Sequence, residues 1–281
     1  MLLSGIVVFL TIISVIYIDN NRLTVSRYNI KSKKIPHGFK NYKILQLSDL
    51  HSKEFGNENS KLIKLINKES PDIIFMTGDM INCRDENYKV FLELASQLSS
   101  LYEVYFVEGN NETRLLSSNR SNLIQSLKKM NIKVLENNKE VLYRGNDFIN
   151  LYGLYFDLKY YRAIHSGYTK ETYFSCEDVT NSLGECNKDE YNILLAHNPL
   201  FFDSYVKWGA DLILSGHIHG GIIRLPYIGG LLSPERKFFP RYSHGQYDKR
   251  ESSIIVNRGL GTKVLMPRIF NPPDISIITL R

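Results

Sequence analysis

Cysteine is scarce in this chain: its 281 residues include three, Cys83, Cys176 and Cys186. No two of them form a Cys-x-x-Cys pair, so a zinc site built from cysteines is not expected. The odd count in a chain of this length also argues against a fold held together by disulfides. One pairing stays open, between Cys176 and Cys186, if the domain lies outside the cytoplasm.

The sequence also lacks long runs of lysine or arginine, internal repeats and low-complexity tracts. Its net charge of +6 is modest, and the densest basic point is Lys31, Lys33 and Lys34. The charge has two explanations: ordinary solubility, or attraction to anionic substrates or anionic lipid. Because basic residues are not interleaved with aromatic ones, nucleic acid is not an expected partner.

The N-terminus holds the one apolar stretch of membrane-segment length. Leu2–Ile18 contains no charged residue, and at ~1.5 Å per residue it is at the short end of what spans a ~30 Å hydrocarbon core. A cleaved signal peptide is the alternative, but the start lacks the basic residues that such a peptide requires. We therefore expect a single-pass anchor in the cell membrane at residues 1–20, a basic juxtamembrane segment at 21–42 and one folded domain at 43–281, with the orientation open.

Short apolar strands alternate with amphipathic helices in the first half of that domain. Such alternation favours right-handed crossovers and a largely parallel sheet. The expected strands are Ile44–Leu47, Ile73–Thr77, Val104–Val107 and Lys133–Leu135, the expected helices lie near Ser60–Glu69, Tyr88–Leu98 and Asn122–Met130, and an edge strand precedes them near Leu23–Ile30.

The second half is richer in strands. Asp157–Asp189 is a polar insertion without a clear motif, which we expect to be helical and near the site. Two strand-rich regions around helical crossovers predict an α/β fold with two sheets packed face to face and helices outside. The expected strands here are Glu140–Tyr143, Phe148–Leu154, Tyr191–Ala196, Asp211–Leu214, Ile222–Leu225, Ser253–Val256 and Ile275–Leu280, with a helix near Phe201–Trp208.

Polar side chains of similar type follow five of the expected strands. Loops at the carboxyl ends of parallel strands share one edge of a sheet, so these side chains can converge. Seven nitrogen and oxygen donors without a thiolate suit two divalent ions, with Mn, Fe or Zn favoured over Ca or Mg. The residues are Asp49, His51, Asp79, Asn110, His197, His217 and His219.

Each of these residues alone has a simpler explanation. Gly78-Asp79 can be a turn, Asn110 can cap a helix, and His197 can be a buried, hydrogen-bonded histidine. The segment Gly216–Gly220, Gly-His-x-His-Gly, is more specific, because alternate residues after a strand point to one side and glycine lets the backbone approach a metal. Asp79 is the natural bridge between two ions, since its carboxylate has two oxygens.

The order Asp-x-His, Gly-Asp, Gly-Asn-x-Glu, His and Gly-His-x-His resembles that of the calcineurin-like metallophosphoesterases, from about Lys43 to Arg281. A membrane-anchored bacterial branch, YkuE/YaeI-like, is more similar still, through residues 48–51, 219–226 and 257–261. The resemblance implies a four-layer αββα sandwich of two mixed sheets flanked by helices. It also implies one metal held by Asp49, His51 and His219, another held by Asn110, His197 and His217, and a bridging Asp79.

One position departs from the family pattern. A histidine commonly follows the ligand asparagine, whereas this chain has Asn111, which can hydrogen-bond a phosphoryl oxygen but cannot deliver a proton at neutral pH. General acid assistance is typically worth ~10²–10⁴-fold. We therefore expect substrates with good leaving groups, with His165 or His244 as untested replacements for the acid. Arg258 is a candidate phosphate contact through its forked guanidinium, or a member of a salt bridge.

These features predict a membrane-anchored phosphohydrolase that cleaves a phosphodiester or pyrophosphate bond through a hydroxide shared by two metal ions. The expected partner is a phosphorylated small molecule or a lipid-linked substrate such as a UDP-diacylglucosamine-like compound. In this hypothesis Asp79 and Asn111 act in catalysis. The alternative is a metal-binding sensor or scaffold that lost turnover when histidine gave way to Asn111.

Overall fold

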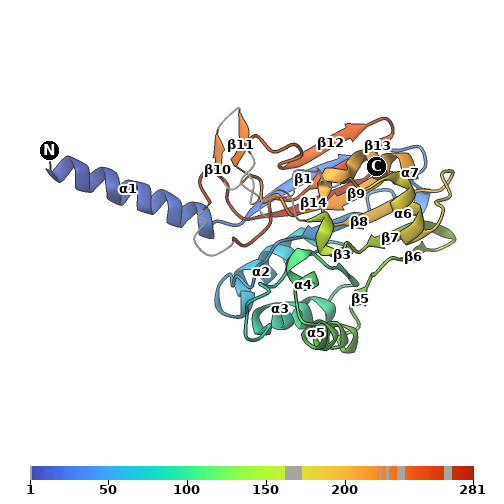
Figure 1. The fold of residues 1–281 in the computed structure, drawn as a ribbon, viewed down its shortest axis with the longest axis horizontal. Coiled ribbons are helices and arrows are strands. Elements are labelled where there is room, and N and C mark those ends of the chain that lie inside the picture. The colour runs from blue at the N-terminus through green and yellow to red at the C-terminus, as the bar shows by residue number, and fades with distance from the viewer. Residues whose placement is uncertain (1, 162–172, 222, 226–227, 233–237, 263–267) are drawn as a thin grey trace.

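The structure is a computed structural model that describes residues 2–161, 173–221, 223–225, 228–232, 238–262 and 268–281, with backbone alone at residues 2–5, 8, 12 and 15 (Figure 1). The helices are α1 Leu2–Asn21, α2 Ser60–Glu69, α3 Lys89–Ser99, α4 Asn110–Thr113, α5 Ser117–Lys129, α6 Cys176–Leu183 and α7 Phe202–Trp208. The strands are β1 Thr24–Ile30, β2 Lys43–Leu47, β3 Ile73–Thr77, β4 Val104–Val107, β5 Lys133–Val134, β6 Asn138–Arg144, β7 Asp147–Leu154, β8 Asn192–Ala196, β9 Leu212–Ser215, β10 Ile223–Leu225, β11 Gly229–Leu232, β12 Gly245–Lys249, β13 Ser252–Val256 and β14 Asp274–Leu280.

Two six-stranded mixed sheets form the centre of the fold. The first has the order β1-β14-β2-β3-β4-β5, with β2 to β5 parallel and β14 antiparallel to β2. The second has the order β12-β13-β9-β8-β7-β6, with β13, β9, β8 and β7 parallel. The carboxyl ends of β2, β3 and β4 therefore share one edge of the first sheet, and those of β8 and β9 share one edge of the second.

Three apolar clusters separate four layers. One cluster lies between the two sheets and includes Phe75, Leu151 and Leu195. A second packs α2, α3 and α5 on the outer face of the first sheet, and a third packs α6 and α7 on the outer face of the second (Figure 1). The sequence-based expectation of two mixed sheets between helical layers is confirmed.

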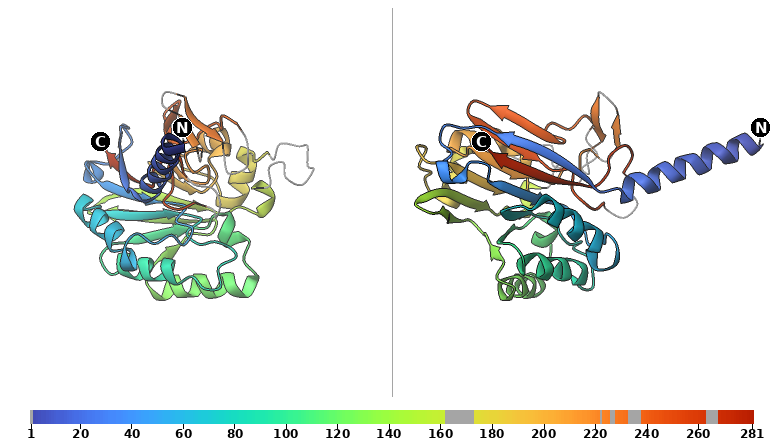
Figure 2. Two further views of the ribbon diagram at one scale, coloured as in Figure 1. Left: turned by 90° about the vertical axis from the view of Figure 1, so that its left-hand side faces the viewer. Right: turned by 180° about the vertical axis from the view of Figure 1, so that it is seen from behind.

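The expected transmembrane anchor at residues 1–20 is wrong, and with it the single-pass membrane localisation. Within the part of the chain that the structure describes, no helix has the length and apolar character needed to cross a bilayer. α1 projects from the body of the molecule (Figure 2), and its last turn is polar and docks on the domain. The Phe270 N–H donates to the Asp19 carboxylate, and Asn20 Nδ2 donates to the Arg268 carbonyl at 3.0 Å.

Sequence reasoning located most of the elements but missed three. The strand β12 and the single-turn helix α4 were not expected, because both are short and carry few apolar residues, and β11 was not expected because two of its four residues are glycine. The segment at residues 21–42 contributes the expected edge strand, β1, and the structure pairs it in parallel with β14. Cys83, Cys176 and Cys186 are all free thiols, so the open pairing of the last two does not occur.

Candidate metal centre

The loops that follow the parallel strands are hydrogen-bonded to one another. The Asp49 N–H donates to the Gly78 carbonyl at 2.9 Å, which joins the loop after β2 to the loop after β3. The Gly216 N–H donates to the His197 carbonyl at 3.1 Å, which joins the loop after β9 to the loop after β8. The His217 N–H donates to Asp49 Oδ2 at 3.1 Å, so residues 168 positions apart meet at one edge, as the strand directions require.

Two groups of potential metal ligands lie at this edge. Each group offers three ligand atoms that lie within 4.8 Å of one another, and all six side chains are buried. The first group is Asp49, His51 and His219, and the second is Asp79, His197 and His217. The first group holds the three residues that the family resemblance assigns to one metal, whereas Asp79 stands with His197 and His217 in the second group and the role of Asn110 stays a prediction.

The spacing inside the first group fits a bound cation. His51 Nε2 lies 3.1 Å from His219 Nε2, and His219 Nε2 lies 3.3 Å from Asp49 Oδ1. The Asn82 side chain faces His51 Nδ1 with its oxygen at 3.2 Å, which places the proton on Nδ1 and the lone pair on Nε2. Two nitrogens bonded to one ion at ~2.1 Å stand about 3.0–3.4 Å apart, so the observed separation suits a shared metal.

Asp79 lies between the two groups. Its Oδ1 is 3.6 Å from His197 Nε2, and its Oδ2 is 3.8 Å from His51 Nε2. Each carboxylate oxygen therefore faces a histidine of a different group, which is the arrangement that a bridging ligand needs.

Two buried polar atoms of the candidate ligands have no hydrogen-bond partner among the described residues. They are His197 Nε2 and Asn110 Oδ1. His197 Nδ1 donates to the Thr77 carbonyl at 2.6 Å, so its Nε2 carries the lone pair and faces the carboxylates. Because unpaired buried polar atoms are costly, these two atoms fit a metal ion that completes their bonding.

The charges of the second group are tightly coupled. Burial opposes ionisation of Asp79, but the nearby imidazoles of His197 and His51 and the Asn111 N–H hold the pKa of its carboxyl well below the ordinary value. Burial opposes protonation of His197, yet the Asp79 and Asp49 carboxylates raise its pKa to about 9. The carboxylates thus attract positive charge strongly, whether it is a proton or a metal ion.

The backbone at the site is strained. Positive φ angles occur at five of the candidate ligands, which is rare for residues other than glycine. The angles are 49° at Asp49, 48° at His51, 54° at Asp79, 73° at His217 and 54° at His219. Such strain persists where the surrounding structure fixes a functional geometry.

Glycines let three loops close around Asp49. A Cβ on Gly216 would overlap Ser48 Oγ and Asp49 Oδ2, and a Cβ on Gly259 would lie 2.6 Å from Asp49 Cβ. The His217 N–H also donates to Asp49 Oδ2 at 3.1 Å. Sequence reasoning noted residues 257–261 for their family likeness alone and missed that they pack on Asp49.

Glu112 is a second residue whose role the sequence did not reveal. Its carboxylate is fully buried and accepts four backbone N–H groups at 2.8–3.3 Å. The donors are Asp79, Met80 and Ile81 after β3 and Gly109 after β4. Glu112 therefore ties the loop that carries Asp79 to the loop that carries Asn110.

Replacing Glu112 by alanine is expected to destabilise the protein, because four buried N–H groups would lose their acceptor. At roughly 1 kcal/mol or more for each orphaned group, the melting temperature should fall by about 8 °C or more. Differential scanning calorimetry measures this change. The exposed Glu86→Ala is the control, and equal melting temperatures for the two variants would contradict this role of Glu112.

Asn111, predicted to act in catalysis, has its side-chain amide engaged with its neighbours. Its Nδ2 donates to Asp79 Oδ2 at 2.6 Å, its Oδ1 accepts from the Cys83 N–H at 3.3 Å, and its own N–H donates to Asp79 Oδ1 at 2.7 Å. These bonds hold the Asp79 carboxylate in place. A direct contact between Asn111 and substrate stays a prediction.

Three other candidates lie away from these bonds. The Arg258 guanidinium is 3.0 Å from Asp274 Oδ1, so the salt bridge is present and phosphate binding stays a prediction. Burial and the charges of Arg258 and Arg224 lower the pKa of His244 to about 3, so His244 is a neutral imidazole near neutral pH and cannot act as a general acid there. His165 lies outside the described residues.

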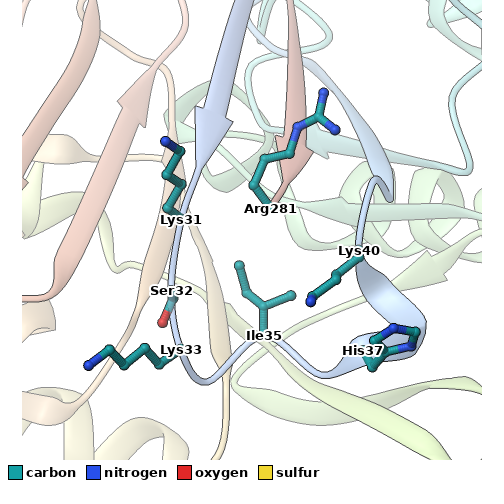
Figure 3. A pocket seen from close by; sticks show the side chains of 7 residues that line it. All are labelled: Lys31, Ser32, Lys33, Ile35, His37, Lys40 and Arg281. Carbon is teal, nitrogen blue, oxygen red and sulfur yellow. The ribbon is translucent and has the colours of Figure 1, made fainter.

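A basic cavity of about 650 Å³ lies at the opposite edge of the first sheet. In the antiparallel pair of β14 and β2, Thr279 lies opposite Lys43, so β14 ends where β2 begins, away from Asp49. Figure 3 shows the side chains that line this cavity, none of which is a candidate metal ligand: Lys31, Ser32, Lys33, Ile35, His37, Lys40 and Arg281.

Comparison with known proteins gives a family and several relatives. The family model described as calcineurin-like phosphoesterase matches residues 42–221. The chain is 28% identical to the uncharacterized metallophosphoesterase YkuE of Bacillus subtilis, over 94% of this chain and 88% of that protein. It is also 28% identical to the phosphodiesterase YaeI of Escherichia coli, over 85% and 82%, and 25% identical to the UDP-2,3-diacylglucosamine pyrophosphatase LpxG of Chlamydia trachomatis, over 93% and 90%.

The family model covers more than half of the chain, so the chain belongs to the calcineurin-like phosphoesterases. It is a hydrolase of phosphoester bonds, and its two adjacent groups of candidate ligands indicate divalent metal ions.

Proposed function

We propose that this calcineurin-like phosphoesterase hydrolyses a phosphodiester or pyrophosphate bond at a centre of two divalent metal ions. The observation that carries the proposal is the position of Asp79, whose two oxygens face histidines of the two different groups. The proposed ligands are Asp49, His51 and His219 for one ion and Asn110, His197 and His217 for the other, with Asp79 shared.

The donor set favours Mn, Fe or Zn, because imidazole nitrogens and carboxylate oxygens are present and thiolates are absent from both groups. When bound, such a pair of ions supplies Lewis-acid stabilisation of the negative charge that develops on the phosphoryl oxygens. The chain's own residues set the geometry: Thr77 and Asn82 orient His197 and His51, and Asn111 orients Asp79.

The substrate is proposed to have a good leaving group, such as a pyrophosphate linkage or an activated diester. The position after Asn110 holds Asn111, and His244 is neutral, so neither donates a proton to a poor leaving group. One relative, LpxG, is by its name a pyrophosphatase of a diacylated UDP-glucosamine, which supports a lipid-linked phosphate as the substrate class.

A cavity beside the site supports a substrate with a large organic group. Its volume is about 370 Å³, and Gly230 in its wall packs against Gly220, the residue after His219. A Cβ on Gly230 would lie 2.7 Å from the Gly220 carbonyl oxygen. The remaining lining is mostly aromatic or apolar: Ile228, Phe239, Pro240, Arg241, Tyr242, Ser243 and Tyr247.

Hydrolysis of bis-p-nitrophenyl phosphate tests the proposal. Purified protein with added Mn²⁺ is expected to release p-nitrophenolate, and chelation by EDTA should abolish the reaction until metal is restored. One alternative is favoured by Asn111: a sensor or scaffold that binds metal without turnover. If calorimetry shows metal binding but this activated diester is not hydrolysed, the result would support that alternative and contradict the proposed hydrolytic function.

A further inference from the structure

Tyr161 has a buried hydroxyl without a hydrogen-bond partner among the described residues. The residue is 5% exposed, and it lies directly before the undescribed residues 162–172. Two other buried orphan atoms at the site, Asn110 Oδ1 and His197 Nε2, are explained as metal ligands. The Tyr161 hydroxyl belongs to neither proposed ligand set, so metal binding does not account for its missing hydrogen-bond partner.

The ring of Tyr161 packs against the second group of candidate ligands. Its centroid lies 5.2 Å from that of His217 and 5.9 Å from that of His197. Tyr161 therefore borders the same edge of the fold at which the two metal ions are proposed to bind.

The position of Tyr161 is fixed by its neighbours. Its N–H donates to the Leu158 carbonyl at 3.0 Å, and Phe156 packs edge-on against its ring at 5.7 Å. Asn198, the residue after His197, donates from Nδ2 to the Tyr160 carbonyl at 3.1 Å. The loop that carries the hydroxyl is thus attached to the loop that carries a candidate ligand.

A tyrosine hydroxyl has an ordinary pKa of about 10, so it carries its proton near neutral pH. A neutral phenol is a hydrogen-bond donor, and a donor aimed at developing negative charge stabilises a phosphoryl transition state. The site needs such a donor, because the amide of Asn111 is engaged with Asp79.

We propose that Tyr161 is a catalytic residue whose hydroxyl donates a hydrogen bond to a phosphoryl oxygen of the substrate. The proposal rests on the proposed function, because it needs a phosphorylated substrate at the metal centre. No proton is transferred in this role: the O–H bond of Tyr161 stays intact while the phosphoryl oxygen gains negative charge.

Tyr161→Phe removes the hydroxyl and keeps the ring. In this variant, kcat for hydrolysis of bis-p-nitrophenyl phosphate with Mn²⁺ should be lower by roughly 10–10²-fold, and KM should change little. Calorimetry of the same manganese-loaded protein with orthovanadate, which mimics the phosphoryl group in the transition state, should show a Kd raised by a similar factor.

Tyr191→Phe is the matched control. Tyr191 also has a buried hydroxyl without a partner among the described residues, but it precedes β8, at the end of that strand away from His197. This variant should retain wild-type kcat and vanadate affinity. If it loses as much as Tyr161→Phe, the effect is general to buried tyrosines and the proposal fails.

Two further outcomes would overturn the proposal. Equal kcat and vanadate affinity in wild type and Tyr161→Phe would show that the hydroxyl makes no hydrogen bond to the phosphoryl group. The proposed enzymatic function would be unaffected by that result. A lower manganese stoichiometry in Tyr161→Phe would show that Tyr161 supports a metal ion instead. Failure of the proposed function is distinct from both, because wild type would then show no metal-dependent hydrolysis.

Discussion

Asp79→Asn is expected to lower kcat for bis-p-nitrophenyl phosphate by roughly 10³-fold or more, the scale of losing an essential charge-stabilising group. The change replaces one carboxylate oxygen by an amide nitrogen, which cannot ligate a metal while it carries its two protons. Since the two oxygens of Asp79 face different histidine groups, one of the two contacts is lost in either orientation of the amide. Initial rates at saturating Mn²⁺ measure the effect.

Asp203→Asn controls for the loss of one negative charge. Asp203 is 45% exposed and pairs with Lys249 at the surface, so its replacement should leave the rate within about two-fold of wild type, as for surface changes in general. An Asp79→Asn variant that folds and turns over at the wild-type rate would contradict the bridging role.

Gly216→Ala is expected to remove activity through a single methyl group. The added Cβ would overlap Ser48 Oγ and Asp49 Oδ2, and Asp49 is held on its other side by Gly259. The Asp49 carboxylate must therefore shift, and metal affinity should fall by roughly 10–100-fold or more, as when groups that support metal ligands are changed. Manganese titration by calorimetry, with circular dichroism to verify folding, measures this loss.

Gly145→Asn is the control for replacing a glycine. A Cβ at Gly145 meets no atom within 4 Å, and asparagine tolerates the φ of 65° at this turn between β6 and β7. Metal affinity in this variant should equal that of wild type. Wild-type affinity in Gly216→Ala as well would show that Asp49 is not confined as the structure indicates.

Strand direction is what made the candidate site predictable. Asp49, Asp79 and Asn110 each follow a segment that is predicted to be one of three consecutive parallel strands. Parallel strands place their carboxyl ends at one edge of the sheet. The same argument predicted that His197 and His217 converge with them, and the structure places both histidines after neighbouring parallel strands of the second sheet. The sequence reasoning could therefore group side chains that lie up to 170 positions apart without knowing any distance.

The supporting contacts were not predictable, because they join loops rather than regular elements. Glu112 accepts its four hydrogen bonds from two loops, and Tyr161 sits in a polar insertion without periodicity. The transmembrane prediction counted apolar residues in Leu2–Ile18 and gave no weight to the polar turn that follows. That turn docks on the domain through Asp19 and Asn20, a long-range contact that no local pattern reveals.

The number of manganese ions bound per chain tests the central claim most directly. Isothermal titration of metal-free protein with Mn²⁺ should give two sites in wild type and fewer than two in Asp79→Asn. Binding of one ion or none by wild-type protein, or two ions with unchanged affinity in Asp79→Asn, would contradict a dinuclear centre joined by that carboxylate.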